Sequence, residues 1–186
     1  MVKNKSLGLI IAGLPLICVT CANPWSEHYN RYKINEYFIA DGDTIYAKIG
    51  GKKVGIRLLG IDTPETRKGK EHLAPYENHF AQKAKKFVEK ILKNDQISIT
   101  KITSDKYQRW VCRVSTASIN DLGIEIIKNG LARVKYLEKE RKNLVYWNNN
   151  GTVIDYYNSL KKAENEAKIN SVGIWKYSEK DVFHKK

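Results

Sequence analysis

The chain contains, at residues 44–58, the run Thr44-Ile45-Tyr46-Ala47-Lys48-Ile49-Gly50-Gly51-Lys52-Lys53-Val54-Gly55-Ile56-Arg57-Leu58. Its first six residues are rich in β-branched and aromatic side chains, which favour strands. After the two glycines, apolar residues return at every second position, as they do on a strand with one buried face. Two such runs joined by Gly-Gly are a strong signal for a hairpin. The run therefore predicts two antiparallel strands with the turn between Ile49 and Lys52.

Further strands and helices are expected on both sides of this hairpin. Apolar alternation predicts three more strands, at residues 34–39, 96–103 and 110–114. Apolar residues spaced by three and four predict two helices, at residues 80–92 and 154–167. A third helix is expected at residues 120–129, because Asn120 or Asp121 can cap its start and Gly130 suits the left-handed position after its end. Five strands and three helices indicate an α+β, mainly β fold, a small partly open barrel with helices packed against it.

The composition limits what the protein can be. Its 186 residues are the length of one ordinary domain, and a hydrophobic content of 42% excludes wholesale disorder. Three cysteines are too few for zinc-finger arrays and disulfide scaffolds. A formal charge of +13 favours an anionic partner, either nucleic acid or acidic lipid, and a lysine-rich proteome is the alternative explanation.

Residues 1–22 have the order of a secretory signal peptide: Lys3 and Lys5, then an apolar run, then small residues up to Ala22. The apolar run is shorter than the about 20 residues of a spanning helix. We expect cleavage after Ala22, and the alternatives are a membrane anchor or a lipid attached to Cys21. The rest of the chain is expected to form a flexible leader, the folded domain and a basic tail, at residues 23–33, 34–178 and 179–186.

Acidic residues stand at the ends of the two hairpin strands. They lie in Asp41-Gly42-Asp43-Thr44, before the first strand, and in Asp62-Thr63-Pro64-Glu65-Thr66, after the second. Because the strands are antiparallel, Asp43 and Asp62 can face each other across a gap the size of a cation. Carboxylates, a backbone carbonyl and water are the ligands of a hard ion such as Ca²⁺, and the lack of cysteine and histidine argues against zinc. Taken singly, each acidic segment is more typical of an Asx turn, and the combination of the two segments with arginines favours the cation site.

Arg57 and Arg109 add a second kind of group, since a guanidinium binds phosphate oxygens in a bidentate way. Arg57 precedes Asp62 by five residues and points to the opposite face of the strand unless a bulge, which Gly60 could supply, intervenes. A cation and two arginines that hold a phosphate, with Glu65 to align or deprotonate water, are the parts needed to hydrolyse a phosphodiester. Salt bridges at the surface are the alternative explanation of either arginine alone.

Five pieces of the sequence, in order over residues 35–177, resemble the staphylococcal nuclease (thermonuclease) family. They are Asp41-Gly42-Asp43-Thr44, Arg57-Leu58-Leu59-Gly60-Ile61-Asp62-Thr63-Pro64-Glu65-Thr66, Asp105-Lys106-Tyr107-Gln108-Arg109, Gly130-Leu131-Ala132-Arg133-Val134 and Gly173-Ile174-Trp175. The block at residues 57–66 is highly specific. The resemblance implies a five-stranded OB-fold barrel with three α-helices, and calcium-dependent cleavage of DNA and RNA to 3′-phosphorylated products.

The resemblance also implies roles for individual residues. Ca²⁺ would be held by Asp43, Asp62 and the Thr63 carbonyl, with Asp41 in the outer shell. The scissile phosphate would be bound by Arg57 and Arg109, and Glu65 would be the base or the group that positions water. The nucleotide pocket would be lined by Lys106, Tyr107 and Tyr136.

The sequence departs from the family's pattern at two positions. Gln108 stands where the family usually has a glycine in the turn before Arg109, and Glu138 stands where a second pocket tyrosine is expected. Neither departure touches the expected catalytic set, but Glu138 would place a negative charge near a bound nucleotide. Cys112 alternates with apolar strand residues and is expected to be buried, whereas the histidines share no ligand spacing and are expected at the surface.

The expected function is that of a calcium-dependent nuclease, secreted or held in the cell envelope through its N-terminal signal. Its substrates would be DNA and RNA, with single-stranded or unpaired regions favoured, and it would act as a monomer without an obligate protein partner. The alternative from another class is a non-catalytic OB-type module that binds nucleic acid or a protein.

Overall fold

The computed structural model describes residues 29–66, 72–137 and 151–184. The expected signal peptide, residues 23–28 of the expected leader and Glu138 therefore lie outside the described residues. The elements follow one another in the order β1 (Arg31–Ile34), β2 (Tyr37–Asp41), β3 (Thr44–Ile49), β4 (Lys52–Leu58), β5 (Ile61–Asp62), α1 (Glu77–Leu92), β6 (Ile97–Ser104), β7 (Trp110–Ser115), α2 (Leu122–Lys128), β8 (Arg133–Val134), α3 (Gly151–Ile169), the 3-10 helix η1 (Gly173–Lys176) and α4 (Glu179–Val182).

The predicted hairpin is confirmed. β3 and β4 pair antiparallel from Thr44 opposite Arg57 to Ile49 opposite Lys52. Gly50 and Gly51 connect them with φ angles of 56° and 80°, which only glycine adopts without steric cost. This register places the start of β3 beside the end of β4, where the acidic segments lie.

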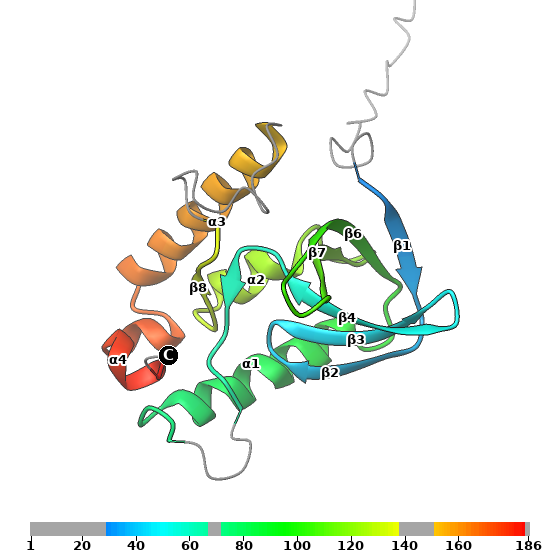
Figure 1. Ribbon diagram of the computed structural model, residues 1–186. Coiled ribbons are helices and arrows are strands. Elements are labelled where there is room, and N and C mark those ends of the chain that lie inside the picture. The colour runs from blue at the N-terminus through cyan, green and yellow to red at the C-terminus, as the bar shows by residue number, and fades with distance from the viewer. Residues whose placement is uncertain (1–28, 67–71, 138–150, 185–186) are drawn as a thin grey trace, which may run out of the picture.

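The strands form a curled sheet with the order β1-β6-β7-β4-β3-β2, and β5 and β8 form a separate antiparallel pair (Figure 1). The first predicted strand, at residues 34–39, is divided by a bend: β1 pairs with β6, whereas β2 pairs with β3. The two halves thus join opposite edges of the sheet and curl it into a half-barrel. The α+β, OB-like fold is confirmed, with one predicted strand split in two.

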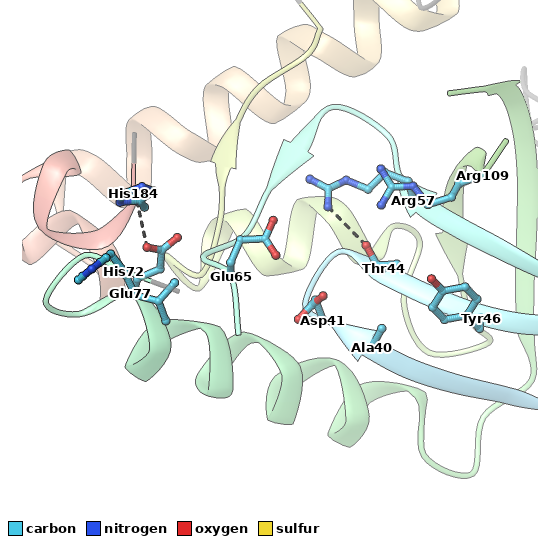
Figure 2. Close-up of a pocket in the computed structure, with 11 residues that line it drawn as sticks. Ala40, Asp41, Thr44, Tyr46, Arg57, Glu65, His72, Glu77, Arg109 and His184 are labelled. Atoms are coloured by element: carbon cyan, nitrogen blue, oxygen red, sulfur yellow. Dashed lines mark hydrogen bonds between the residues drawn. The ribbon is translucent and has the colours of Figure 1, made fainter. Parts of the chain in front are cut away.

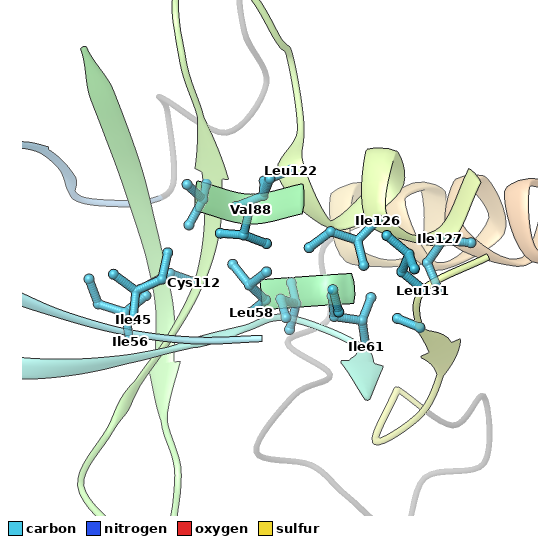
Figure 3. Close-up of a cluster of buried hydrophobic side chains, with 14 of the residues drawn as sticks. Ile45, Ile56, Leu58, Ile61, Val88, Cys112, Leu122, Ile126, Ile127 and Leu131 are labelled. Carbon is cyan, nitrogen blue, oxygen red and sulfur yellow. The ribbon is translucent and has the colours of Figure 1, made fainter. Parts of the chain in front are cut away.

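The hydrophobic core lies between the curled sheet and helices α1 and α2. In Figure 3, Ile45, Ile56 and Cys112 from the strands meet Val88 of α1 and Leu122 of α2. Cys112 is buried as predicted, and burial raises the pKa of its thiol to about 12. Asp121 caps α2 by accepting a hydrogen bond from the Ile124 amide at 2.9 Å.

The prediction of three helices is wrong, because the described residues contain four α-helices. The additional helix, α4, occupies part of the expected basic tail, and Val182 and Phe183 are buried in the core. The fold also begins before residue 34, since Arg31–Ile34 pair with β6. Figure 1 shows α3 and α4 on the side of the molecule away from β1. Among the described helices, none has the length and apolar character needed to cross a membrane.

Candidate active site

The open end of the β3–β4 hairpin brings Arg57 into contact with two carboxylates. Arg57 forms an ion pair with Asp43 at the start of β3, and its Nη2 lies 3.2 Å from Oδ1 of Asp62 on β5. The chain turns between β4 and β5 at Gly60, with a φ of 73°. A Cβ at this position would lie 2.2 Å from Cδ1 of Leu137, so only glycine fits. The predicted irregularity at Gly60 therefore places Arg57 and Asp62 on the same side.

Asp43 is buried, and its environment is electrostatically costly for a carboxylate. Burial raises the pKa of Asp43, although the Arg57 charge and the Thr63 amide, which donates to Oδ2 at 2.8 Å, act in the opposite direction. The nearby Asp62 carboxylate raises the pKa of Asp43 further. For Arg57, burial is outweighed by the charges of Asp43 and Asp62, which raise the pKa of the guanidinium. The two carboxylates are thus close enough to repel each other, and a cation between them relieves that repulsion.

The donor chemistry at this point fits a hard divalent cation. Asp41, Asp43 and Asp62 supply carboxylate oxygens, and the Thr63 carbonyl belongs to the same segment of chain. Within the described part of the chain, no three acidic, histidine or cysteine side chains converge as a ready metal cluster. Arg57 instead pairs with both Asp43 and Asp62, and the Thr66 hydroxyl donates to Asp41.

Arg57, Arg109, Glu65 and Asp41 line one pocket of about 640 Å³. Figure 2 shows Glu65 between the group formed by Arg57 and Asp41 and a second group formed by His72, Glu77 and His184. The pocket therefore combines two guanidiniums with a partly exposed carboxylate from a third segment. This is the combination expected from the sequence.

Arg109 is held at the edge of the pocket by Asp105. Nε and Nη2 of Arg109 both lie 2.7 Å from Oδ2 of Asp105, whose other oxygen accepts the amides of Tyr107 and Arg109. Burial opposes ionisation of Asp105, but these hydrogen bonds prevail and lower its pKa. Gln108 adopts a left-handed φ of 63° in this turn. The conformation explains why glycine is the usual residue at this place in the family's pattern.

The expected nucleotide-binding residues lie in two places. Tyr136 faces the carboxylates: its hydroxyl is 3.4 Å from Oδ1 of Asp62, and its ring centre is 5.8 Å from the Arg57 guanidinium. Lys106 and Tyr107 lie outside the pocket lining, on the turn beyond Arg109. The Tyr107 ring is exposed, with Lys106 Nζ at 5.0 Å and the Arg109 guanidinium at 5.5 Å from its centre.

Sequence reasoning assigned no role to several residues that the structure places at the site. Arg133 and Lys135 both contact Asp62, and Tyr46 lines the pocket beside Arg57. His72 and His184 are exposed, as expected, yet they line the pocket as well. Arg133 lies in a quoted piece of the sequence, but only the pairing of β5 with β8 shows that it meets Asp62.

The chain is similar to several known proteins. The sequence model of the family described as "Staphylococcal nuclease homologue" matches residues 55–177. An uncharacterized protein of Methanocaldococcus jannaschii is 32% identical, over 82% of this chain and 74% of that protein. A protein named thermonuclease, from Staphylococcus intermedius, is 29% identical over 93% of this chain and 98% of its own length. Endonuclease YncB of Bacillus subtilis is 28% identical over 74% of this chain and 59% of its own length.

Proposed function

The chain belongs to the staphylococcal nuclease homologue family, and from this premise we propose that it is a metal-dependent nuclease that uses Ca²⁺ to cleave DNA and RNA, leaving 3′-phosphates. The observation that carries the proposal is the pocket that gathers Arg57, Arg109 and Glu65 beside the carboxylates of Asp41, Asp43 and Asp62. Three segments of the chain contribute to it: residues 41–43 with two carboxylates, residues 57–65 with Arg57, Asp62 and Glu65, and the turn before β7 with Arg109.

Arg57 and Arg109 bind the phosphate in this proposal. Their guanidiniums reach the same pocket from β4 and from the turn before β7. Charge on the phosphoryl oxygens increases as water attacks, so donors that are already in place stabilise the transition state more than the substrate. Arg57 is preorganised by Asp43 and Asp62, and Arg109 by Asp105.

Glu65 aligns the attacking water and accepts its proton. Its carboxylate projects into the pocket near Arg57, and its negative charge contributes to the raised pKa of the Arg57 guanidinium. A carboxylate within reach of the water contributes about 10²–10⁴-fold to such a reaction. A divalent ion would be held by Asp43, Asp62 and the Thr63 carbonyl, with Asp41 nearby, and would supply Lewis-acid stabilisation of the phosphoryl oxygens.

The substrate in this proposal is a single strand or an unpaired region of DNA or RNA. A chain charge of +13 attracts the phosphate backbone, and the exposed rings of Tyr107 and Tyr136 can stack on unpaired bases. We further propose that the protein acts as a monomer and is exported by residues 1–22. Sequencing the N-terminus of the mature protein tests export and separates a cleaved signal from an anchor.

A chelator experiment tests the proposed reaction. The purified protein is incubated with single-stranded DNA and with RNA in Ca²⁺, then with excess EGTA, and then with Ca²⁺ restored. We expect degradation that stops with EGTA, returns with Ca²⁺ and leaves ends that a phosphatase dephosphorylates. Undiminished cleavage in EGTA would remove the metal mechanism. A gel shift without degradation in Ca²⁺ would favour the non-catalytic binding module.

A further inference from the structure

The face of β2, β3 and β4 that carries Arg57 extends along the strands beyond the two arginines. Side chains alternate across a sheet, so Lys53 and Gly55 share a face with Arg57 on β4, and Tyr46 shares a face with Thr44 on β3. The Arg57 guanidinium lies 3.4 Å from the Thr44 hydroxyl, so these residues of β3 and β4 lie on the same face of the sheet. The face that holds Arg57 thus extends along the strands to Tyr46.

Tyr46 and Phe38 are neighbours on this face. They lie directly opposite each other on β2 and β3, and side chains at such paired positions are within contact range. Phe38 is 61% exposed, which is unusual for a phenylalanine on the sheet of a folded domain. Tyr46 lines both the 640 Å³ pocket and a second groove of about 320 Å³, and Phe38 lines that groove. The two aromatic rings therefore lead outward from the candidate active site.

Gly55 lies beside both the Tyr46 ring and the side chain of Arg109. A Cβ at Gly55 would lie 3.0 Å from Cγ of Arg109 and 3.4 Å from Cε1 of Tyr46. The absence of a side chain at Gly55 lets the side chains of Arg109 and Tyr46 both approach β4 at the same place. The path from the arginines to the aromatic pair is thus continuous.

Lysines flank both rings. Nζ of Lys53 lies 4.7 Å from the ring centre of Tyr46, and Nζ of Lys85, on α1, lies 5.3 Å from that of Phe38. Glu36 is the acidic residue among the described residues that line the groove, and Lys48 pairs with it at 3.4 Å. Aromatic rings interleaved with lysines are complementary to bases linked by phosphates, and a purely apolar partner would leave these lysines unpaired.

We propose that Tyr46 and Phe38 form a stacking platform for two consecutive bases of a single-stranded nucleic acid, next to the phosphate bound by Arg57 and Arg109. Lys53 and Lys85 neutralise the phosphates of those nucleotides. Adjacent strands lie about 4.8 Å apart, so the path from β4 to β2 spans about 10 Å, enough for two nucleotides. The inference rests on the proposed function, because it extends the substrate path of the same site.

Binding is measured by fluorescence anisotropy with a labelled, cleavage-resistant phosphorothioate dT12 in Ca²⁺, and with unlabelled dT2 as competitor. We expect Phe38→Ala and Tyr46→Ala each to weaken dT12 binding by about fivefold or more, with a smaller loss for dT2, since one stacked base contributes at least that factor. Phe38→Trp keeps a stacking surface and should restore binding. Ile169→Ala is the control, because Ile169 is 82% exposed on α3, away from the groove.

The lysines are tested through salt dependence. Lys53→Gln and Lys85→Gln should each reduce the slope of log affinity against log salt by about 0.7, the value for one phosphate of a single strand. Lys128→Gln, at an exposed position of α2, should leave the slope unchanged.

The outcomes separate this inference from the nuclease proposal. Wild-type dT12 affinity in both aromatic variants would overturn the platform, even if the protein cleaves DNA. Loss of binding in those variants without cleavage by the wild type would support the platform and contradict the nuclease. If Phe38→Ala instead abolished self-association in sedimentation experiments and left dT12 affinity unchanged, the patch would be a protein interface and the platform would be wrong.

Discussion

Arg133 donates from Nε and Nη2 to the same oxygen, Oδ2, of Asp62, at 3.0 and 2.7 Å. The two residues are register partners on β8 and β5, although 71 positions separate them in the sequence. At its other end the Arg133 guanidinium lies 3.8 Å from the ring centre of Phe183 and pairs with Glu179 of α4. The C-terminal helix is thus connected through Arg133 to a carboxylate of the candidate metal site.

Replacing Arg133 with glutamine should destabilise the protein by about 2 kcal/mol, because Asp62 loses the hydrogen bonds from Arg133 and keeps only Arg57 and Lys135 as cationic partners among the described residues. Glu179→Gln is the matched control. Glu179 is 62% exposed at its side chain, so its ion pair with Arg133 should contribute less than about 1 kcal/mol. Both values come from urea unfolding without added metal. Equal stabilities of the two variants would show that Arg133 does not support Asp62.

Glu65→Gln should lower the turnover number on single-stranded DNA by about 10²–10⁴-fold while the protein still folds, because glutamine keeps the shape of the side chain but cannot accept a proton. Initial rates at saturating DNA and Ca²⁺ measure the effect, and urea unfolding checks the fold. Glu89→Gln, at an exposed position on α1, should retain wild-type turnover. Full activity of Glu65→Gln would contradict the role proposed for this carboxylate.

Gln108→Gly should stabilise the protein by about 1 kcal/mol. Gln108 has a left-handed φ of 63°, a conformation that costs a residue with a side chain about 1–2 kcal/mol. Glycine removes this cost, but its greater conformational freedom in the unfolded chain offsets part of the stabilisation. Gln82→Gly, at an exposed position inside α1, changes the same residue types and should destabilise by about 1 kcal/mol. Urea midpoints give both values, and a loss of stability in Gln108→Gly would show that the turn carries no strain.

The part of the site closest to the hairpin could be predicted from the sequence. Gly50-Gly51 determines the register, and the register places Asp43 beside the strand that ends before Asp62. The two-residue periodicity of the hairpin strands was therefore enough to predict which residues of β3 and β4 lie side by side. Even the irregularity at Gly60 was visible, because a glycine in a strand often marks a bulge or a turn.

The contribution of the C-terminal half could not be predicted in the same way. β5 and β8 contain two residues each, which is too short for any periodicity, so the contact of Asp62 with Arg133 leaves no local pattern. Residues 179–186 are mainly charged, and α4 forms because Val182 and Phe183 find a core made by distant elements. Such contacts depend on the complete fold.

Glu164 is a charged residue on the apolar face of α3 and is only 2% exposed. It accepts hydrogen bonds from the Val134 amide at 2.7 Å, from Lys168 at 3.1 Å and from Lys161. Burial alone would raise the pKa of Glu164, but these hydrogen bonds together lower it below the ordinary value of 4.5. Glu164 therefore holds β8, and with it Arg133, against α3.

A carboxyl group with a lowered pKa in the folded state adds stability that is present above its ordinary pKa and disappears as the pH falls through the folded value. Glu164→Gln should therefore be less stable than the wild type at pH 7, and the difference should shrink as the pH falls below about 5. Urea unfolding across this range measures the difference. Glu166, two residues further along α3, is exposed, so Glu166→Gln should show no comparable loss of stability at pH 7. A gap for Glu164→Gln that stays constant down to acid pH would mean that packing, and not the charge of Glu164, holds β8 in place.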